Sequence, residues 1–435
     1  MFSVILFLLG LNVSAETFET SPVPSVMTRD VPAMIQLQKP RALSYLLQNI
    51  SPADTALGVV VASPSKSEPD YYYHWVRDAA LVMASVQDRL EKTSESRERQ
   101  FYEKKLFDFA AFSRRNQLAR TLSGFGEPKF FVDGRGFDGP WGRPQNDGPA
   151  LRALTLIRFA KHLLKDPLNR KYVVEHLYDS KLPTQSAIKA DLEYVSHHWR
   201  APSFDLWEEV FGEHFYTHMV QRASLVEGAK LAEMLKDPEA ARFYRTEAIK
   251  LEAKLKSYWN GRYIGATRTP SENKPSNLDL AVVLGVLHGD TQDGFYSVNS
   301  PQVRASVQHL EEAFYNLYRV NRNGQIGIAI GRYPEDTYDG VQTNSLGNPW
   351  FLGNHALAEY YYKLAKDSSK KISPLQRAEW MQKGDEFLAR SFSHMNQSNG
   401  SFSEQFHRTS GYMQGARDLT WSYASFLTAT EARQF

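Results

Sequence analysis

The chain has 435 residues, with 51 Lys and Arg against 49 Asp and Glu, and its net charge is +2 at pH 7. The charges are interspersed, and no basic stripe is long enough to follow a phosphate backbone, so we expect no nucleic-acid partner. Hydrophobic residues make up 42% and aromatic residues 13% of the chain, a composition that excludes a disordered protein.

The N-terminus has the pattern of an export signal. An apolar run from Val4 to Leu11 precedes the small residues Ser14 and Ala15, which predicts a signal peptide over 1–15 with cleavage before Glu16. Because the run is too short to cross a bilayer, we expect a secreted or periplasmic protein without a membrane anchor. The chain has no cysteine, so no disulfide supports it in an oxidising compartment.

Helical periodicity dominates the rest of the chain, after an N-terminal arm over 16–37. Two segments start with clear helix-start signals, at Asp237-Pro238 and Ser373-Pro374. The apolar spacing i, i+3, i+4 predicts twelve amphipathic helices, over 38–50, 77–92, 101–118, 148–165, 185–199, 216–234, 238–257, 278–288, 301–319, 352–366, 374–392 and 418–433.

The links between these helices are of two kinds. Links after the second, sixth and tenth segments are short and polar, whereas several links after odd-numbered segments are rich in aromatic and acidic residues and contain Trp75, Trp141, Trp207 and Trp350. In a ring of alternating up and down helices, all odd-to-even links emerge at one end. No linker of Pro, Gly and Ser divides the chain. The pattern therefore predicts one all-α domain, an (α/α)6 barrel with its chemistry on one face.

Three carboxylates gather around Trp207, at Asp205, Glu208 and Glu209. Repulsion among them and the apolar ring are expected to raise at least one carboxyl pKa. A carboxylic acid beside an aromatic ring is suited to protonating a glycosidic oxygen. The alternative is a solvated helix N-terminus whose acidic residues complement the dipole.

Glycoside hydrolysis needs a second carboxyl group, and Glu404 is the candidate. It lies about 200 residues further along the sequence. In the proposed ring the two residues can still lie close in space, if both loops reach the same face. By itself Glu404 is an ordinary loop residue.

Other links combine rings with charged groups. The stretch from Asp70 to Asp78 holds Tyr71, Trp75 and Arg77, a mixture that stacks on sugars and binds hydroxyl pairs, or that forms a core cluster with a structural ion pair. Arg332 and Trp141 stand in similar surroundings.

One pair of histidines has the spacing of metal ligands on a helix. His214 and His218 share the spacing i, i+4, but no third ligand accompanies them, and a paired structural role is favoured over a metal site. We expect no metal and no cofactor.

The chain resembles the glucoamylase family of inverting glycoside hydrolases over roughly 38–433. The resemblance is carried by strings in the family's order: SPS at 63–65, PDY at 69–71, WVRD at 75–78, GEPKF at 126–130, WGRPQNDGP at 141–149, FDLWEEV at 204–210, GRYPEDTY at 331–338, GNPWFL at 347–352, SEQ at 403–405 and RDLTWSY at 417–423. It implies an (α/α)6 barrel that removes glucose from the non-reducing ends of α-glucans and releases β-glucose.

The resemblance also implies roles for individual residues. Glu208 is the expected general acid and Glu404 the expected general base. The expected substrate-binding residues are Tyr71 and Gln405 near the attacking water, Arg77, Asp78 and Arg332 on the terminal glucose, Asp205 and Glu209 toward the next sugar, and Trp75, Lys129, Trp141, Trp207 and Trp421 along the walls. For inversion, the two carboxyl groups are expected to stand about 6.5–9.5 Å apart.

Two alternatives remain open at this point. One is a related inverting enzyme that prefers α-1,6 linkages or trehalose, and the other is a carbohydrate sensor on the same barrel without catalysis. We expect residues 38–435 to form the catalytic domain, with no appended starch-binding module, and the protein to act as a monomer on malto-oligosaccharides. No site residue is assigned over 269–290.

Overall fold

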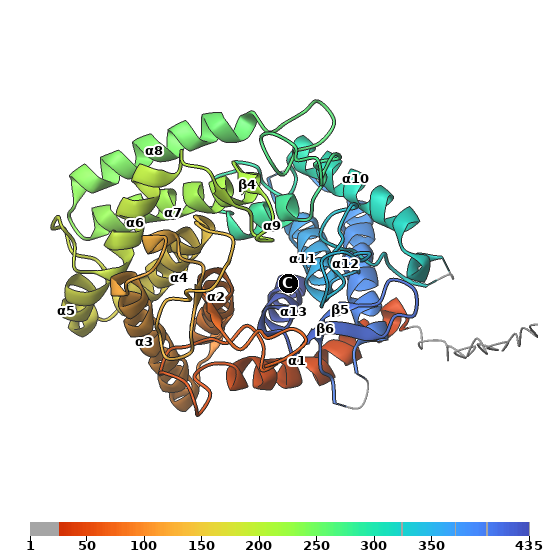
Figure 1. The fold of residues 1–435 in the computed structure, drawn as a ribbon, viewed down its shortest axis with the longest axis horizontal. Helices are drawn as coiled ribbons and strands as arrows, with labels where there is room; N and C mark the ends of the chain where they lie inside the picture. Colours follow the sequence, from red (N-terminus) through yellow and green to blue (C-terminus); the bar gives the residue numbers. More distant parts are fainter. Residues whose placement is uncertain (1–25, 323–324, 370, 397–398, 435) are drawn as a thin grey trace, which may run out of the picture.

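A computed structural model describes residues 26–322, 325–369, 371–396 and 399–434. The predicted signal peptide lies outside these residues. In the described part, twelve helices of at least eight residues form two concentric rings (Figure 1). The chain winds once around the ring, and its first and last long helices lie side by side.

The inner ring is closed, because each of its helices packs on the next and the last packs on the first. Its members are α2 (Val76–Lys92), α4 (Asp147–Leu163), α7 (Phe215–Met234), α9 (Ala281–His288), α11 (Phe351–Lys366) and α13 (Thr420–Arg433). Helix α9 is apolar on every side and is buried from Ala281 to Leu287. A helix of this kind is stable only inside a core.

The outer ring consists of helices with one apolar face. They are α1 (Val31–Gln48), α3 (Ser96–Leu118), α6 (Ala187–His198), α8 (Pro238–Lys256), α10 (Pro301–Leu317) and α12 (Pro374–His394). Two of them begin as the sequence predicts. The side chains of Asp237 and Ser373 accept backbone N–H groups at the starts of α8 and α12, and a proline follows each cap.

All twelve predicted segments correspond to these helices, which confirms the (α/α)6 barrel. The first helix starts earlier than expected, at Val31 rather than at 38, so the end of the expected arm is helical. Val31 and Ile35 are buried in the core. Pro32 stands in the first turn, where a helix needs no N–H donor, and it therefore begins the helix.

Small elements lie in the links. Besides α5 (Arg170–Tyr172) and a π-helical turn over Val173–Leu177, four 3-10 turns occur at Thr28–Asp30, Gly124–Gly126, Pro167–Asn169 and Arg319–Asn321. Three antiparallel pairs join β1 (His74–Trp75) to β2 (Lys129–Phe130), β3 (Ser203–Phe204) to β4 (Phe211–Gly212), and β5 (Ser403–Phe406) to β6 (Met413–Arg417). The pairs were not predicted, and all three lie in outer-to-inner links.

Among the described residues, no helix is both long and apolar enough to cross a membrane.

Candidate active site

The outer-to-inner links meet over a cavity of about 310 Å³ at the N-terminal end of the inner helices. Eleven residues expected at a binding site line it: Tyr71, Trp75, Arg77, Asp78, Trp141, Trp207, Glu208, Glu209, Arg332, Glu404 and Trp421. Other lining residues were not assigned from the sequence, among them Tyr338, Thr343 and Trp350. The pattern of the links thus predicted the correct end of the barrel.

Glu208 stands on a strained turn that its neighbours hold in place. Its φ is +69°, in the left-handed region that a glutamate rarely adopts. The amide of Glu208 donates to the carbonyl of Asp205 at 2.9 Å. The side chain of Asp205 in turn accepts the amides of Glu209 at 2.8 Å and Val210 at 3.0 Å. The acidic cluster seen in the sequence is therefore a compact turn that directs Glu208 to the cavity.

The carboxylate of Glu208 accepts four hydrogen bonds. Oε1 accepts the indole N–H of Trp75 at 2.8 Å, the amide of Gln145 at 3.0 Å and the guanidinium of Arg77 at 3.3 Å. Oε2 accepts the indole N–H of Trp141 at 2.9 Å. All four donors stabilise negative charge on this group.

Glu404 differs from Glu208 in its burial, because Glu404 is only 1% exposed. Burial raises its pKa to about 8, although the charge of Arg332 and a hydrogen bond from Tyr71 oppose the shift. The hydroxyls of Tyr71 and Tyr338 lie 2.9 Å apart beside it. Backbone also approaches closely, since a Cβ at Gly415 would stand 2.5 Å from Oε2 of Glu404.

Arg77, which lines the cavity, is held in place by ion pairs and a hydrogen bond. Arg77 donates to Gln145 at 2.9 Å and pairs with Asp147 at 3.1 Å, and its Nε lies 3.6 Å from Asp78. Burial raises the pKa of Asp78 to about 6, against the opposing charge of Arg77. These polar groups point at a space lined by rings, the arrangement by which proteins bind sugar hydroxyls.

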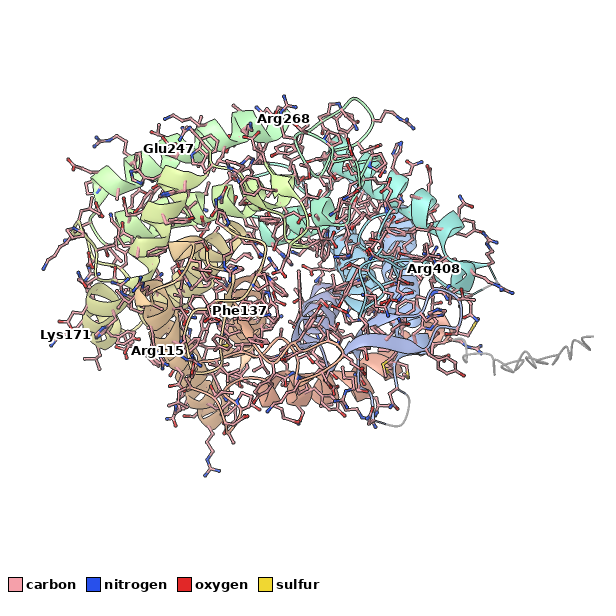
Figure 2. All side chains as sticks on the ribbon, viewed as in Figure 1. Arg115, Phe137, Lys171, Glu247, Arg268 and Arg408 are labelled. Carbon is pink, nitrogen blue, oxygen red and sulfur yellow. The ribbon has the colours of Figure 1, made fainter. Side chains whose placement is uncertain are left out.

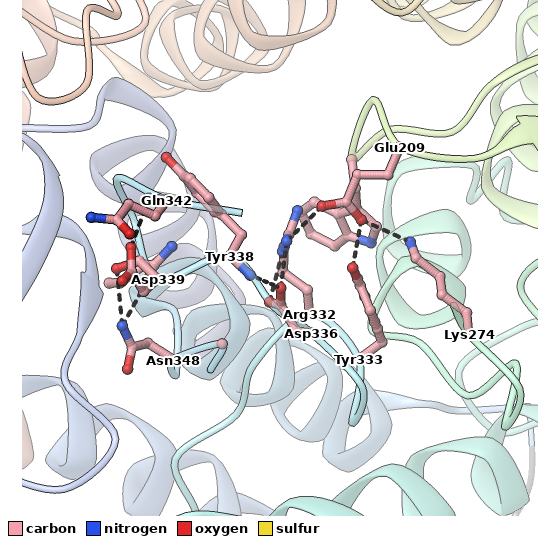
Figure 3. A network of polar contacts seen from close by, with 12 residues as sticks. Glu209, Lys274, Arg332, Tyr333, Asp336, Tyr338, Asp339, Gln342 and Asn348 are labelled. Carbon is pink, nitrogen blue, oxygen red and sulfur yellow. Dashed lines mark hydrogen bonds and ion pairs between the residues drawn. The ribbon is translucent and has the colours of Figure 1, made fainter. Parts of the chain in front are cut away.

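Arg332 lies in a second ionic cluster. It pairs in a bidentate manner with Asp336, with contacts of 2.9 and 2.5 Å, and reaches Glu209 at 2.8 Å (Figure 3). Burial opposes its charge, but Asp336 and Glu209 raise its pKa above the usual range. Arg332 therefore stays charged at every working pH.

Lys129, Asp205 and Gln405 do not line the cavity, in contrast to what the sequence suggested. Gln405 accepts the amide of Asn348 at 3.0 Å and lies 3.4 Å from Glu404, so it stands behind Glu404. Asp205 is buried under the Glu208 turn. Each of the three supports a lining residue from behind.

Lys129 lies behind the aromatic wall. Its ammonium stands 3.8 Å from the ring centre of Trp141, 4.5 Å from that of Trp75 and 4.2 Å from that of Phe137. Phe137 lies toward the middle of the molecule (Figure 2). The β1–β2 pairing of Trp75 with Lys129 fixes this arrangement. Burial lowers the pKa of Lys129 to about 8.

Among the three carboxyl groups of the acidic cluster, Asp205 has a lowered pKa. Burial opposes ionisation there, but Lys274, His214 and two backbone amides lower the pKa. Lys274 was missed because it lies in the stretch over 269–290, to which no site residue was assigned from the sequence. Its neighbour Asp279 accepts the indole N–H of Trp207 at 2.9 Å. Burial raises the pKa of Asp279 to about 7.

The two histidines considered as metal ligands are engaged elsewhere. His214 contacts Thr267 at 3.1 Å and the carbonyl of Ser203 at 3.0 Å. His218 contacts Tyr258 at 3.0 Å and the carbonyl of Trp199 at 3.1 Å. Within the described ranges, no group of three potential ligands is arranged to hold a metal ion.

The sequence and the fold are similar to those of known proteins. The family model described as Glycosyl hydrolases family 15 matches residues 40–431. The chain is similar to "Glucoamylase" of Blastobotrys adeninivorans, with 41% identity over 90% of this chain and 70% of that one. It is also similar to "Glucoamylase 1" of Rhizopus oryzae, with 37% identity over 89% and 68%.

A solved structure, "Glucoamylase from Saccharomycopsis fibuligera at atomic resolution", superposes with a TM-score of 0.84 and 31% identity, covering 96% of this chain and 98% of that one.

Proposed function

The chain belongs to family 15 of the glycosyl hydrolases, and from this membership we propose that Glu208 and Glu404 are its catalytic acid and base. The protein is a glycoside hydrolase of the glucoamylase type. It removes α-1,4-linked glucose from the non-reducing ends of α-glucans, with inversion at the anomeric carbon. The observation that carries the residue assignment is that both carboxyl groups line one aromatic cavity.

The reaction assigns each carboxyl a separate task. Glu208 donates a proton to the glycosidic oxygen as the bond from that oxygen to C1 breaks. Glu404 accepts a proton from a water molecule that attacks C1 from the other face, so the released sugar is the β-anomer. For this geometry the two carboxyl groups must stand about 6.5–9.5 Å apart.

Exposure supports this division of roles. The non-reducing end enters the cavity first, so the leaving sugar lies toward the opening. The side chain of Glu208 is 17% exposed and its donor Trp141 is 36% exposed, whereas Glu404 is 1% exposed. Glu208 therefore stands nearer the side on which the glycosidic oxygen leaves. Its four donors stabilise the carboxylate that forms when the proton departs.

The terminal glucose binds to the charged groups that line the cavity. Arg77, Asp78 and Arg332 direct hydrogen-bonding atoms into the cavity, and Trp75 and Trp421 cover apolar faces of the ring. A cavity of about 310 Å³ has room for few sugar units, in keeping with removal of one glucose at a time.

The proton affinities do not decide the roles. Burial raises the pKa of Glu404 to about 8, which favours its protonated form, while a base must be ionised. The raised pKa of Glu404 alone would suit this group to the acid role. A test must therefore separate the two roles rather than show only that both groups are needed.

α-D-Glucosyl fluoride separates them, because fluoride leaves without a proton. We expect Glu208→Gln to lose at least ~100-fold in kcat on maltose but to keep most of its rate on the fluoride. Glu404→Gln should lose both activities. The reverse pattern would exchange the roles, and near-normal turnover of maltose by either variant would remove that residue from the mechanism.

Linkage and stereochemistry are tested by proton NMR of maltotriose, isomaltose and trehalose during the first minutes of reaction. β-Glucose as the first product from maltotriose is expected. α-Glucose would contradict inversion.

Export and domain boundaries are further parts of the proposal. The predicted signal peptide over 1–15 supports a secreted or periplasmic location. The catalytic unit is proposed to comprise 38–435 together with the helical turns before it, acting as a monomer. Mass spectrometry of the exported protein should find Glu16 as the first residue.

A further inference from the structure

The link between α8 and α9, over 257–280, carries a buried cation that no sequence motif indicated. Lys274 is 6% exposed, and its ammonium contacts three carboxylates. The distances are 2.9 Å to Oδ2 of Asp205, 3.2 Å to Oε2 of Glu209 and 3.8 Å to Oδ2 of Asp279. A lysine is buried in this way only when paired charges offset its desolvation.

Glu209 is the member of this cluster that faces the cavity. Its side chain is 29% exposed, and three groups fix its carboxylate (Figure 3). Arg332 pairs with Oε1 at 2.8 Å, while the hydroxyl of Tyr333 donates to Oε2 at 2.6 Å beside Lys274. The ammonium of Lys274 also lies 3.8 Å from the ring centre of Tyr333. Lys274 therefore touches both the carboxylate and the side chain that orients it.

We propose that Lys274 is a positioning residue that holds Glu209 for hydroxyl groups of the leaving sugar, and so sets the preference for a sugar over a simple alcohol on that side. The inference rests on the proposed function, which places the leaving sugar toward the cavity opening beside Glu208 and Glu209.

A second route of action must be distinguished from this one. Lys274 also pairs with Asp205, whose side chain accepts two amides of the turn that carries Glu208. Loss of Lys274 could disturb the acid through that turn instead of disturbing Glu209. The two routes differ in the substrates that they affect.

Three substrates separate the routes. Maltose requires both a proton from Glu208 and contacts to a leaving sugar. Methyl α-glucoside requires the proton but presents no second sugar, and α-glucosyl fluoride requires neither. We expect Lys274→Met to lower kcat/KM for maltose about tenfold, chiefly through KM, as is typical for losing one hydrogen bond to a charged group. Rates on the other two substrates should stay within about threefold.

Matched variants control the experiment. Lys104→Met removes an exposed lysine paired with Asp108 on α3 and should change none of the three rates. Glu209→Gln should give the same substrate pattern as Lys274→Met. If Lys274 acts through Glu209, the double variant loses less on maltose than the product of the single losses.

Folding is controlled separately, because Lys274→Met leaves Asp205 and Asp279 without their cation. The same substitution is therefore also made with Asp279→Asn, which removes one buried charge while its side-chain oxygen still faces Trp207. Thermal unfolding of all variants is measured beside the kinetics.

Each outcome has a distinct meaning. A selective loss on maltose in both backgrounds supports the inference. An equal loss on maltose and methyl α-glucoside, with the fluoride spared, shows action through Glu208 and overturns it. Equal losses on all three substrates assign Lys274 to the fold alone, which overturns it too. If the unmodified protein releases no glucose from maltose, the proposed function itself fails.

Discussion

Replacing Trp141 by Phe tests how the hydrogen bonds to Glu208 contribute to proton transfer. The substitution keeps a ring near Lys129 and removes one N–H, which donates to Oε2 of Glu208 at 2.9 Å. The other three donors, all to Oε1, remain. With Glu208 as the proposed acid, the transition state for proton donation places new negative charge on this carboxylate, so the lost donor raises the barrier.

The expected size follows from the exposure of the site. A hydrogen bond to a charged group contributes about 1.5–3 kcal/mol. Trp141 is 36% exposed, which favours the lower end of that range. Because the proton is only partly transferred in the transition state, about 1 kcal/mol is lost, or roughly fivefold in kcat on maltose.

The assay compares glucose release from maltose with fluoride release from α-glucosyl fluoride, for which we expect no change. Trp199→Phe is the matched control. Its indole N–H donates to a carboxylate at the same distance, 2.9 Å, but the acceptor is Glu247 at the periphery of the molecule (Figure 2). This variant should lose about 1 kcal/mol of stability and keep its kcat. An equal loss on both substrates by Trp141→Phe would refute the reasoning, as would an unchanged rate on maltose.

Three further predictions concern charge and space inside the barrel. Burial lowers the pKa of His355 to about 3, below its unfolded value near 6.5, so its contribution to stability is present above pH 6.5 and is lost as the pH falls toward 3. His355→Gln should flatten the fall of the unfolding free energy with acid by up to about 1.4 kcal/mol per pH unit, and parallel curves of unfolding free energy against pH would contradict this. Arg152 and Asp191 form a buried bidentate pair, so Arg152→Met should lower the urea unfolding free energy by about 3–5 kcal/mol. Adding Asp191→Leu should recover much of that loss, and a single-variant loss under about 1 kcal/mol would show that the pair is unimportant. Gly415 has φ +74°, and a methyl group there would meet Glu404 at 2.5 Å, so Gly415→Ala should lower kcat about 100-fold on both maltose and the fluoride. A change confined to maltose would argue that Glu404 had not moved.

The helices could be predicted because their information is local. Apolar periodicity within each segment marked the buried face, and caps such as Asp237 and Ser373 marked the starts. The three strand pairs could not be predicted, since each strand has two to five residues and Trp75 pairs with Lys129 across 54 positions. Such pairing leaves no period in the sequence.

The site shows the same division. Aromatic residues beside carboxylates in the sequence indicated the cavity-lining residues. They did not show whether a given side chain faces the cavity or packs behind the aromatic rings. Lys129 was expected in the cavity and lies behind the rings. Lys274 and Asp279 stand in a stretch without an aromatic neighbour, and their importance arises only from contacts with Asp205 and Trp207. Local residue composition does not indicate contacts between segments that lie far apart in the sequence.

The ring architecture also bears on how the carboxyl groups of Glu208 and Glu404 can share one cavity. Carboxylates brought together repel each other, which tends to leave one of them protonated. Here the N-terminal ends of the inner helices surround the cavity, with Asp78 and Asp147 in the first turns of α2 and α4. Helix N-termini favour negative charge, and Arg77, Arg332 and Lys274 add three buried cations. The helix N-termini supply a positive field, and the cations determine which carboxylate is stabilised. Arg77 pairs with Glu208 directly. Arg332 stabilises the charge of Glu404 without pairing with it, and its own ion pair is with Asp336. The raised pKa of Glu404 thus arises from burial that the charge of Arg332 opposes, and it should respond to substitution of Arg332 more than to substitutions elsewhere in the barrel.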